Sequence, residues 1–192
     1  MAFLIAGLLI FLGLHSMRVV ADGWRARMVQ RWGEMQWKGA YALLSLGGLM
    51  LLGHGYGLAR LDPLVLWTPP VGMRHATSLL VLAAFILLVA TYVPRNSIKA
   101  RLHHPMLLAA ALWAFGHLLA NGTLVDVLLF GSFLVWAVVT FASSQRRDRA
   151  QSVVYPPGAL LPTIATVVIG IVAWAVFALW LHGWFFGVRP FG

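Results

Sequence analysis

Apolar residues recur along the chain in long runs that are separated by short polar segments. A helix needs about 20 mostly apolar residues to cross a bilayer core of about 30 Å. Lipid accepts helices because they satisfy their own backbone polar groups. The pattern therefore predicts an all-α protein, an integral membrane bundle of about six transmembrane helices in a single domain over residues 1–192. We place the helices near 2–18, 39–59, 75–93, 105–121, 123–143 and 163–187.

The composition supports lipid rather than water as the main solvent. Hydrophobic residues make up 61% of the chain and charged residues 10%, whereas a soluble domain carries about 25% charged residues. The net charge of +9 would suit nucleic acid if the basic residues formed a patch. They are instead scattered through short loops, so we expect a bilayer partner and no nucleic acid. Because the chain has no cysteine, thiolate metal sites and cysteine nucleophiles are excluded.

The basic residues also predict an orientation, because cytoplasmic loops of bacterial membrane proteins carry the excess of Lys and Arg. Three alternate loops share one side: Arg18, Arg25, Arg27, Arg31, Lys38, Arg95, Lys99, Arg101, Arg146, Arg147 and Arg149. The other side has only Arg60, Arg74 and Arg189. We expect a multi-pass protein of the bacterial inner membrane with both termini periplasmic. The N-terminal run lacks the features of a cleaved signal peptide, so it is expected to remain as the first helix.

Two connections have distinct predicted characters. The fourth and fifth helices are joined only by residues 121–123, whose sequence Asn-Gly-Thr favours a turn. These two helices are therefore expected to form a tight hairpin. The segment 143–158 is the most polar of the chain and contains Pro156, Pro157 and Gly158. It is expected to be a flexible loop.

Three of the seven histidines, His15, His54 and His117, lie within predicted helices. An ionisable residue in a membrane span indicates function by default. The alternative is an interhelical hydrogen bond, worth about 0.6 kcal/mol on average in a membrane protein. Together the three histidines favour a buried cofactor. Haem suits them, because imidazole is a standard axial ligand and helix bundles hold cofactors between facing helices.

The surroundings of these histidines differ. His104 precedes the helix that contains His117, and a separation of 13 residues places the two about 140° apart around the axis. His104 is therefore expected at the solvated rim. His117 shares its face with Trp113 and small residues that leave room for a porphyrin. Arg18 follows His15 by one turn, where it would either pair with a haem propionate or anchor the helix at the cytoplasmic side.

Four motifs resemble the NnrU family: GLHSMR near the N-terminus, PP followed by MRH at 69–75, HPMLLAAALWAFGHLLANG from His104, and LFGSFLVWA from Leu129. The resemblance covers about residues 2–143. The family is similar to plant zeta-carotene isomerase, a membrane enzyme that uses haem b. Its bacterial members are linked by name to nitrite and nitric oxide reduction in denitrification. The resemblance implies haem b with His15 and His117 as axial ligands.

Two observations qualify that assignment. The isomerase branch has a cysteine three residues before the second histidine, where this chain has Ala114, so a ligand switch from thiolate to imidazole is impossible here. From the helix rise, the depths of His15 and His117 differ by roughly 8 to 10 Å. His54 matches the depth of His117 more closely. We therefore keep His54 as the alternative partner.

Three hypotheses follow for the function. The first is a haem b membrane protein linked to nitrite and nitric oxide redox metabolism. The second is haem-dependent cis–trans isomerisation of a membrane polyene, such as zeta-carotene, which would be a hydrophobic small-molecule substrate. The third is an assembly or structural protein without cofactor, in which buried histidines only join helices. The sequence does not decide whether the protein is an enzyme.

Overall fold

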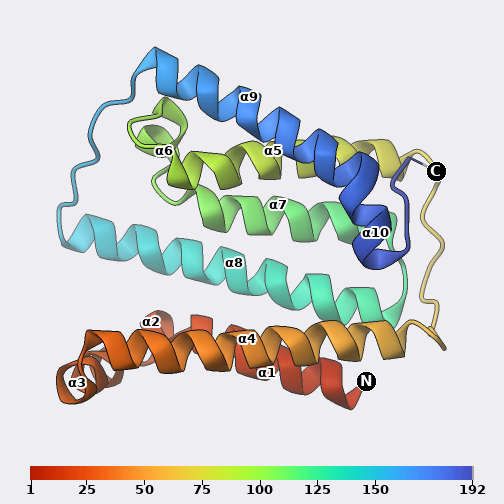
Figure 1. The fold of residues 1–192 in the computed structure, drawn as a ribbon, viewed down its shortest axis with the longest axis horizontal. Helices are drawn as coiled ribbons and strands as arrows, with labels where there is room; N and C mark the ends of the chain where they lie inside the picture. Colours follow the sequence, from red (N-terminus) through yellow and green to blue (C-terminus); the bar gives the residue numbers. More distant parts are fainter. Residues whose placement is uncertain (192) are drawn as a thin grey trace. The chain divides into compact units, whose positions relative to one another are not determined.

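The computed structural model describes residues 1–191, and its chain forms two compact units (Figure 1). Unit 1 comprises residues 1–67 and 122–136, and unit 2 comprises 68–121 and 137–191. Among these residues there is no strand, only one isolated backbone bridge in each unit, Val65 with Thr123 and Asn96 with Ala159. The all-α prediction is confirmed. The prediction of a single domain over 1–192 stays a prediction.

Unit 1 is built on a pair of long apolar helices, α1 (Ala2–His15) and α4 (Glu34–Ala59). Two short helices join them, α2 (Met17–Val20) and α3 (Asp22–Trp32). Helix α1 runs antiparallel to α4, since Gly55 faces Leu4 and Gly48 faces Ile10. A Cβ atom at Gly48 would lie 2.9 Å from Cγ2 of Ile10. Glycine therefore lets the two backbones approach closely, as small residues do in membrane proteins.

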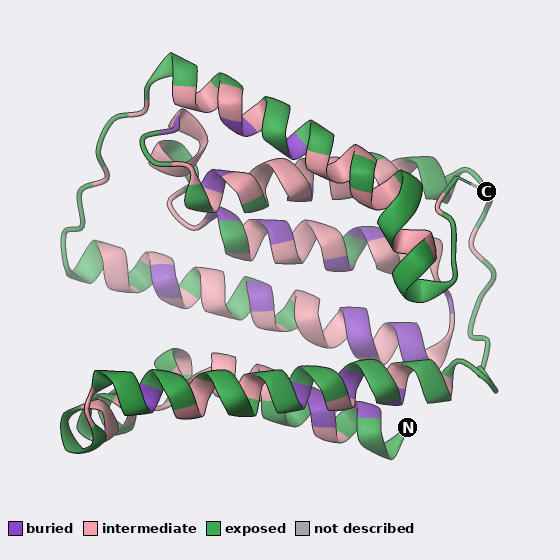
Figure 2. Ribbon diagram, in the orientation of Figure 1, coloured by how far each residue is buried: buried purple, intermediate pink, exposed green. Residues whose placement is uncertain are grey.

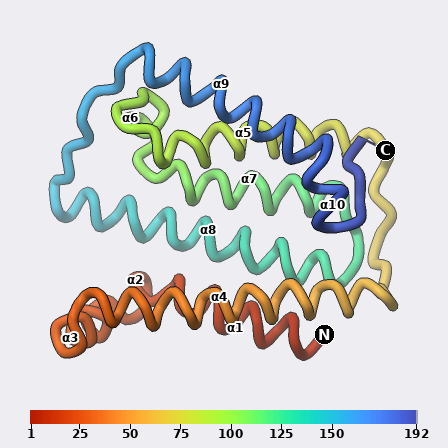
Figure 3. Tube along the Cα trace, viewed as in Figure 1, coloured from red at the N-terminus to blue at the C-terminus, as the bar shows by residue number. Residues whose placement is uncertain are grey.

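Unit 2 is centred on α5 (Met73–Tyr92), with α7 (Pro105–Ala120) and α9 (Leu160–Val176) packed against it, as the trace in Figure 3 shows. The Thr77 hydroxyl of α5 donates to the Gly116 carbonyl of α7 at 2.7 Å. Gly170 of α9 faces the backbone of Ile86. A π-helical turn (Phe177–Leu181) and α10 (His182–Phe186) follow α9.

A buried asparagine forms the corner between α5 and the short helix α6 (Ser97–Leu102). Asn96 is 1% exposed. Its amide nitrogen donates to the carbonyls of Ala90 and Val93, and its side-chain oxygen accepts from the Lys99 amide at 2.7 Å. The same side chain thus satisfies the end of one helix and caps the start of the next. Sequence analysis did not predict α6, because its six residues show no apolar period.

The six predicted helices all exist, with two differences. Helix α8 (Leu124–Ala150) continues well beyond the predicted end at 143, so the flexible loop predicted over 143–158 is wrong for its first half. The last predicted helix is interrupted by the π-helical turn, although its sequence there has neither Pro nor Gly. The connection between α7 and α8 has the predicted three residues.

Burial follows the pattern of a protein in lipid (Figure 2). Large apolar side chains such as Leu43 (73% exposed), Met50 (67%) and Leu160 (76%) lie on the surface of the helices. Buried positions include small or polar residues such as Ala90, Ala114 and Thr166. Helices α4, α5, α8 and the combined segment Leu160–Phe186 are long and apolar enough to span a membrane, while α1 and α7 are shorter. This chain is a membrane protein.

Candidate functional site

His15 ends α1 in unit 1, where aromatic rings surround its imidazole. The Phe11 ring stacks on it at a centroid distance of 4.2 Å, and the rings of Tyr41 and Trp136 lie at 5.3 and 6.1 Å. Its Nδ1 lies 2.7 Å from the Phe11 carbonyl oxygen. A carbonyl only accepts, so Nδ1 carries the proton. The lone pair of the neutral ring is then on Nε2, which is the nitrogen able to coordinate a metal.

His117 has the same arrangement in unit 2. Its Nδ1 lies 2.8 Å from the Trp113 carbonyl oxygen, one turn earlier on α7. Ala114, on the same helix, is fully buried. Metal-bound histidines generally donate their second ring N–H to a carbonyl or carboxylate, which fixes the tautomer and the ring. His15 and His117 each satisfy this condition within their own unit.

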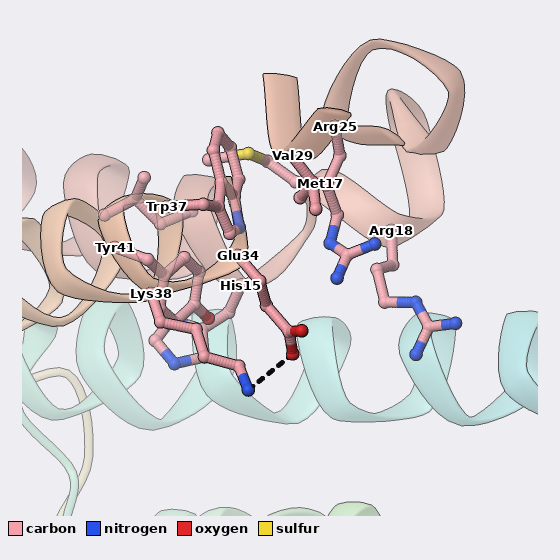
Figure 4. A pocket seen from close by; sticks show the side chains of 10 residues that line it. His15, Met17, Arg18, Arg25, Val29, Glu34, Trp37, Lys38 and Tyr41 are labelled. Carbon is pink, nitrogen blue, oxygen red and sulfur yellow. Dashed lines mark ion pairs between the residues drawn. The ribbon is translucent and has the colours of Figure 1, made fainter. Parts of the chain in front are cut away.

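A cleft of about 360 Å³ adjoins His15. This volume lies near the lower end of the range for small-molecule sites, about 300 to 1,000 Å³. Figure 4 shows the side chains that line it, drawn from α1 to α4. They are Leu14, His15, Met17, Arg18, Arg25, Val29, Glu34, Trp37, Lys38 and Tyr41.

The charge of this cleft is predominantly positive. Arg18, Arg25 and Lys38 line it, and Glu34 is the carboxylate among the lining residues. Lys38 pairs with Glu34 at 2.7 Å. Arg18 and Arg25 each form an ion pair with Asp22 at 3.9 Å, and the lining residues still carry more positive than negative charges. The cleft can therefore accept an anionic group.

His54 lies at the other end of unit 1. Its exposed side chain is beside the Phe3 ring, at a centroid distance of 5.6 Å. His15 instead packs on Tyr41, 13 residues earlier on α4, which corresponds to about 20 Å along that helix. His15 and His54 thus do not share a site. The assignment of His54 as an alternative partner for His117 stays a prediction.

His104 has a different environment from the one predicted. Its Nε2 lies 2.8 Å from Oδ2 of Asp148 on α8, and the two side chains are 21% and 18% exposed. The Tyr155 hydroxyl donates to the same oxygen at 2.7 Å. The neighbouring His103 ring stacks on Tyr155 at 4.1 Å with an interplanar angle of 1°. The rim of unit 2 is therefore a specific polar cluster rather than freely solvated side chains.

This cluster fixes the segment after α8. Burial and the hydrogen bond to Asp148 raise the pKa of Tyr155 to about 12. Further along, the Ala159 amide donates to the Arg95 carbonyl at 2.8 Å, and the Ser97 amide donates to the Thr163 hydroxyl. The second half of the predicted flexible loop is thus held by contacts at both its ends.

Sequence analysis also missed a buried carboxylate in unit 1. Asp126 is 5% exposed. Its Oδ1 accepts from the Tyr56 hydroxyl at 2.7 Å, and its Oδ2 accepts from the Thr123 hydroxyl at 2.6 Å. The Asp126 amide donates to the Thr123 hydroxyl oxygen at 3.3 Å, and the Thr123 amide donates to Oδ2 of Asp126 at 3.2 Å, so the two residues form a capping box at the start of α8. The Thr-x-x-Asp pattern was a readable signal for the cap, but its partner Tyr56 was not readable.

Within residues 1–191 no three His, Asp or Glu side chains gather to hold a metal ion. A haem iron needs only one or two axial ligands from the protein, so isolated histidines remain relevant. A family model described as NnrU protein matches residues 3–190. The chain belongs to the NnrU family. The match of this NnrU protein extends through the last helices, beyond the residues 2–143 over which the sequence motifs indicated the resemblance. No curated protein and no solved structure matches it.

Proposed function

We propose that this NnrU protein binds haem b through His15 and supports nitrite and nitric oxide redox metabolism. The observation that carries the proposal is the contact of His15 Nδ1 with the Phe11 carbonyl oxygen at 2.7 Å. The Nδ1–H of this imidazole is held by the Phe11 carbonyl, so Nε2 is available as an axial ligand beside a cation-lined cleft. The link to nitrogen oxides rests on the resemblance to the NnrU family.

The side chains that line the cleft are chemically suited to haem. Haem carries two carboxylates, and guanidinium groups bind carboxylates strongly. Arg18, one turn from His15, is the side chain we assign to a propionate. The aromatic rings of Phe11 and Tyr41 would exclude water around the imidazole. A bound haem would supply one-electron redox chemistry and an iron that binds small ligands.

His117 is the second ligand that we propose. It has the same protonation pattern, with the Trp113 carbonyl as the acceptor. Buried Ala114 is three residues before it, so no thiolate is at hand to replace the imidazole. This favours a stable imidazole ligand over the ligand exchange implied for the isomerase branch.

The proposed location is the bacterial inner membrane with both termini in the periplasm. Each unit supports the orientation separately. In unit 1, five basic residues lie on or between the end of α1 and the start of α4, and only Arg60 follows α4. In unit 2, six lie on α6 or near the ends of α5 and α8, whereas Arg74 and Arg189 lie at the opposite helix ends. The larger group is assigned to the cytoplasm.

The test is the absorption spectrum of protein purified after expression with ample haem. We expect a haem b spectrum that His15→Ala and His117→Ala each lose or convert from six-coordinate to five-coordinate. His54→Ala and His104→Ala are the controls and should keep it. If the parent protein purifies without haem, the cofactor proposal fails in favour of a structural role. Turnover of a cis-polyene by the haem-loaded protein would instead support the isomerase.

A further inference from the structure

The cleft beside His15 is lined by two basic side chains, Arg25 and Lys38, that have no role in the proposed haem binding. Arg25, on α3, has a side chain that is 35% exposed and lies 3.9 Å from Asp22. Lys38, one turn into α4, is 72% exposed. Both line the cleft together with the apolar side chains of Leu14 and Val29. The cleft therefore combines positive charge with apolar surface.

Three tryptophans, Trp24, Trp32 and Trp37, cluster beside this cleft. Trp24 and Trp32 of α3 are 45% and 51% exposed, and their rings pack on Trp37 of α4 at 5.9 and 6.3 Å. Trp37 is 8% exposed and lines the cleft. Tryptophan is enriched at the level of lipid headgroups. The tryptophans therefore support a position of α3 at the level of the lipid headgroups, beside the apolar helices α1 and α4.

We infer that this cleft binds the phosphate-bearing headgroup of an anionic phospholipid. Arg25 and Lys38 pair with the phosphate, and Leu14 and Val29 contact the adjoining glycerol and first acyl carbons. Basic pockets between transmembrane helices on the cytoplasmic side bind such headgroups, and the cytoplasmic leaflet is rich in anionic lipid. The inference goes beyond haem binding and needs no haem. It uses the proposed orientation only to name the leaflet.

The test measures phosphatidylglycerol retained by the purified full-length protein in native mass spectrometry, with haem content recorded on the same sample. The variant Arg25→Gln with Lys38→Gln removes both cations. The matched control is Arg27→Gln with Arg31→Gln, which removes two exposed cations of α3 that do not line the cleft. A direct hydrogen bond from one lining cation to the phosphate contributes about a fivefold factor in affinity, and Arg27 and Arg31, which do not line the cleft, make no such bond. We expect roughly 30-fold weaker retention in the first pair and an unchanged value in the control.

A third variant guards against loss through misfolding. Glu34→Gln removes the lining carboxylate and frees Lys38, so phosphatidylglycerol retention should rise. Equal losses in both double variants would show general attraction and overturn the site. Displacement of the lipid by equimolar inorganic phosphate would identify a free-anion site instead. Lipid binding that appears only when haem is absent would assign the cleft to a propionate and also overturn it. Retention that is independent of haem supports the lipid site even if haem binding fails.

Discussion

The pair of Tyr56 and Asp126 offers a quantitative test of unit 1. Tyr56→Phe keeps the ring, which packs edge-on against Phe130 at 6.4 Å, and removes only the hydroxyl that donates to Asp126. Interhelical hydrogen bonds in membrane proteins average about 0.6 kcal/mol with a maximum near 1.7. A bond to a charged acceptor contributes about 1.5 to 3 kcal/mol in general. Since Oδ2 of Asp126 keeps its bond to Thr123, we expect a destabilisation of about 1 to 1.5 kcal/mol.

The assay is a double-mutant cycle in reversible unfolding by denaturing detergent, followed by circular dichroism. Asp126→Ala alone should cost more than Tyr56→Phe, because it also removes the capping box at the start of α8. The coupling energy should be about 1 kcal/mol. Tyr92→Phe, at a tyrosine that is 72% exposed, is the control. A coupling energy within about 0.3 kcal/mol of zero, the limit expected for independent sites, would refute the pair.

Other predictions concern packing, topology and pH. Gly48→Leu should separate α1 from α4 and lower thermal stability by several degrees, whereas Gly47→Leu, where no described atom lies within 4 Å of the added Cβ, should be nearly neutral. A cysteine placed at exposed Gln151 should react with labelling reagents from the cytoplasm, and one placed at Asp62 should react from the periplasm. If an impermeant reagent added to intact cells labels only the cysteine at 151, the orientation is the opposite of the one proposed. Because the pKa of Tyr155 is raised from 10.0 to about 12, its neutral hydroxyl stabilises the fold below pH 10, and this contribution is lost as the pH rises through 12. Tyr155→Phe should therefore lose less stability than the parent between pH 10 and 12 in alkaline unfolding, and identical losses would contradict the Asp148 contact.

The membrane helices were predictable because each is long and apolar, a signal that needs no tertiary information. The residue at which α8 ends could not be predicted in this way. The polar residues from 143 onward read as a loop, yet the Arg147 guanidinium binds the hydroxyls of Ser143 and Ser144 on the same helix. Asp148 is held by His104 and Tyr155. Local and distant partners together stabilise a helix that composition alone opposes.

The positions of the charged residues could likewise be predicted only in part from the sequence. The sequence predicted which side of the membrane they occupy, a property that depends on counting. It did not predict that Asp126 would be buried against Tyr56, 70 positions away, because such pairing depends on the register between helices. Register is set in unit 1 by glycines such as Gly48, whose contacts with α1 can be recognised only once the two helices are seen together.

The histidines illustrate how the structure narrows a chemical hypothesis. Depth alone had favoured His54, since it measures only position along a helix. The structure adds the partner of each ring nitrogen. In His15 and His117 the Nδ1 atom contacts the carbonyl four residues earlier on the same helix, whereas Nδ1 of His182 contacts the carbonyl of Val188, outside its helix. The Nε2 atom of His104 is hydrogen-bonded to Asp148. The side chain of His54 is exposed and lies beside the Phe3 ring. A histidine whose Nδ1 donates to a backbone carbonyl makes the hydrogen bond that metal-bound histidines generally make with their second ring nitrogen. In His15 and in His117 this bond lies within one unit, so the spectrum of each single variant tests each proposed ligand separately.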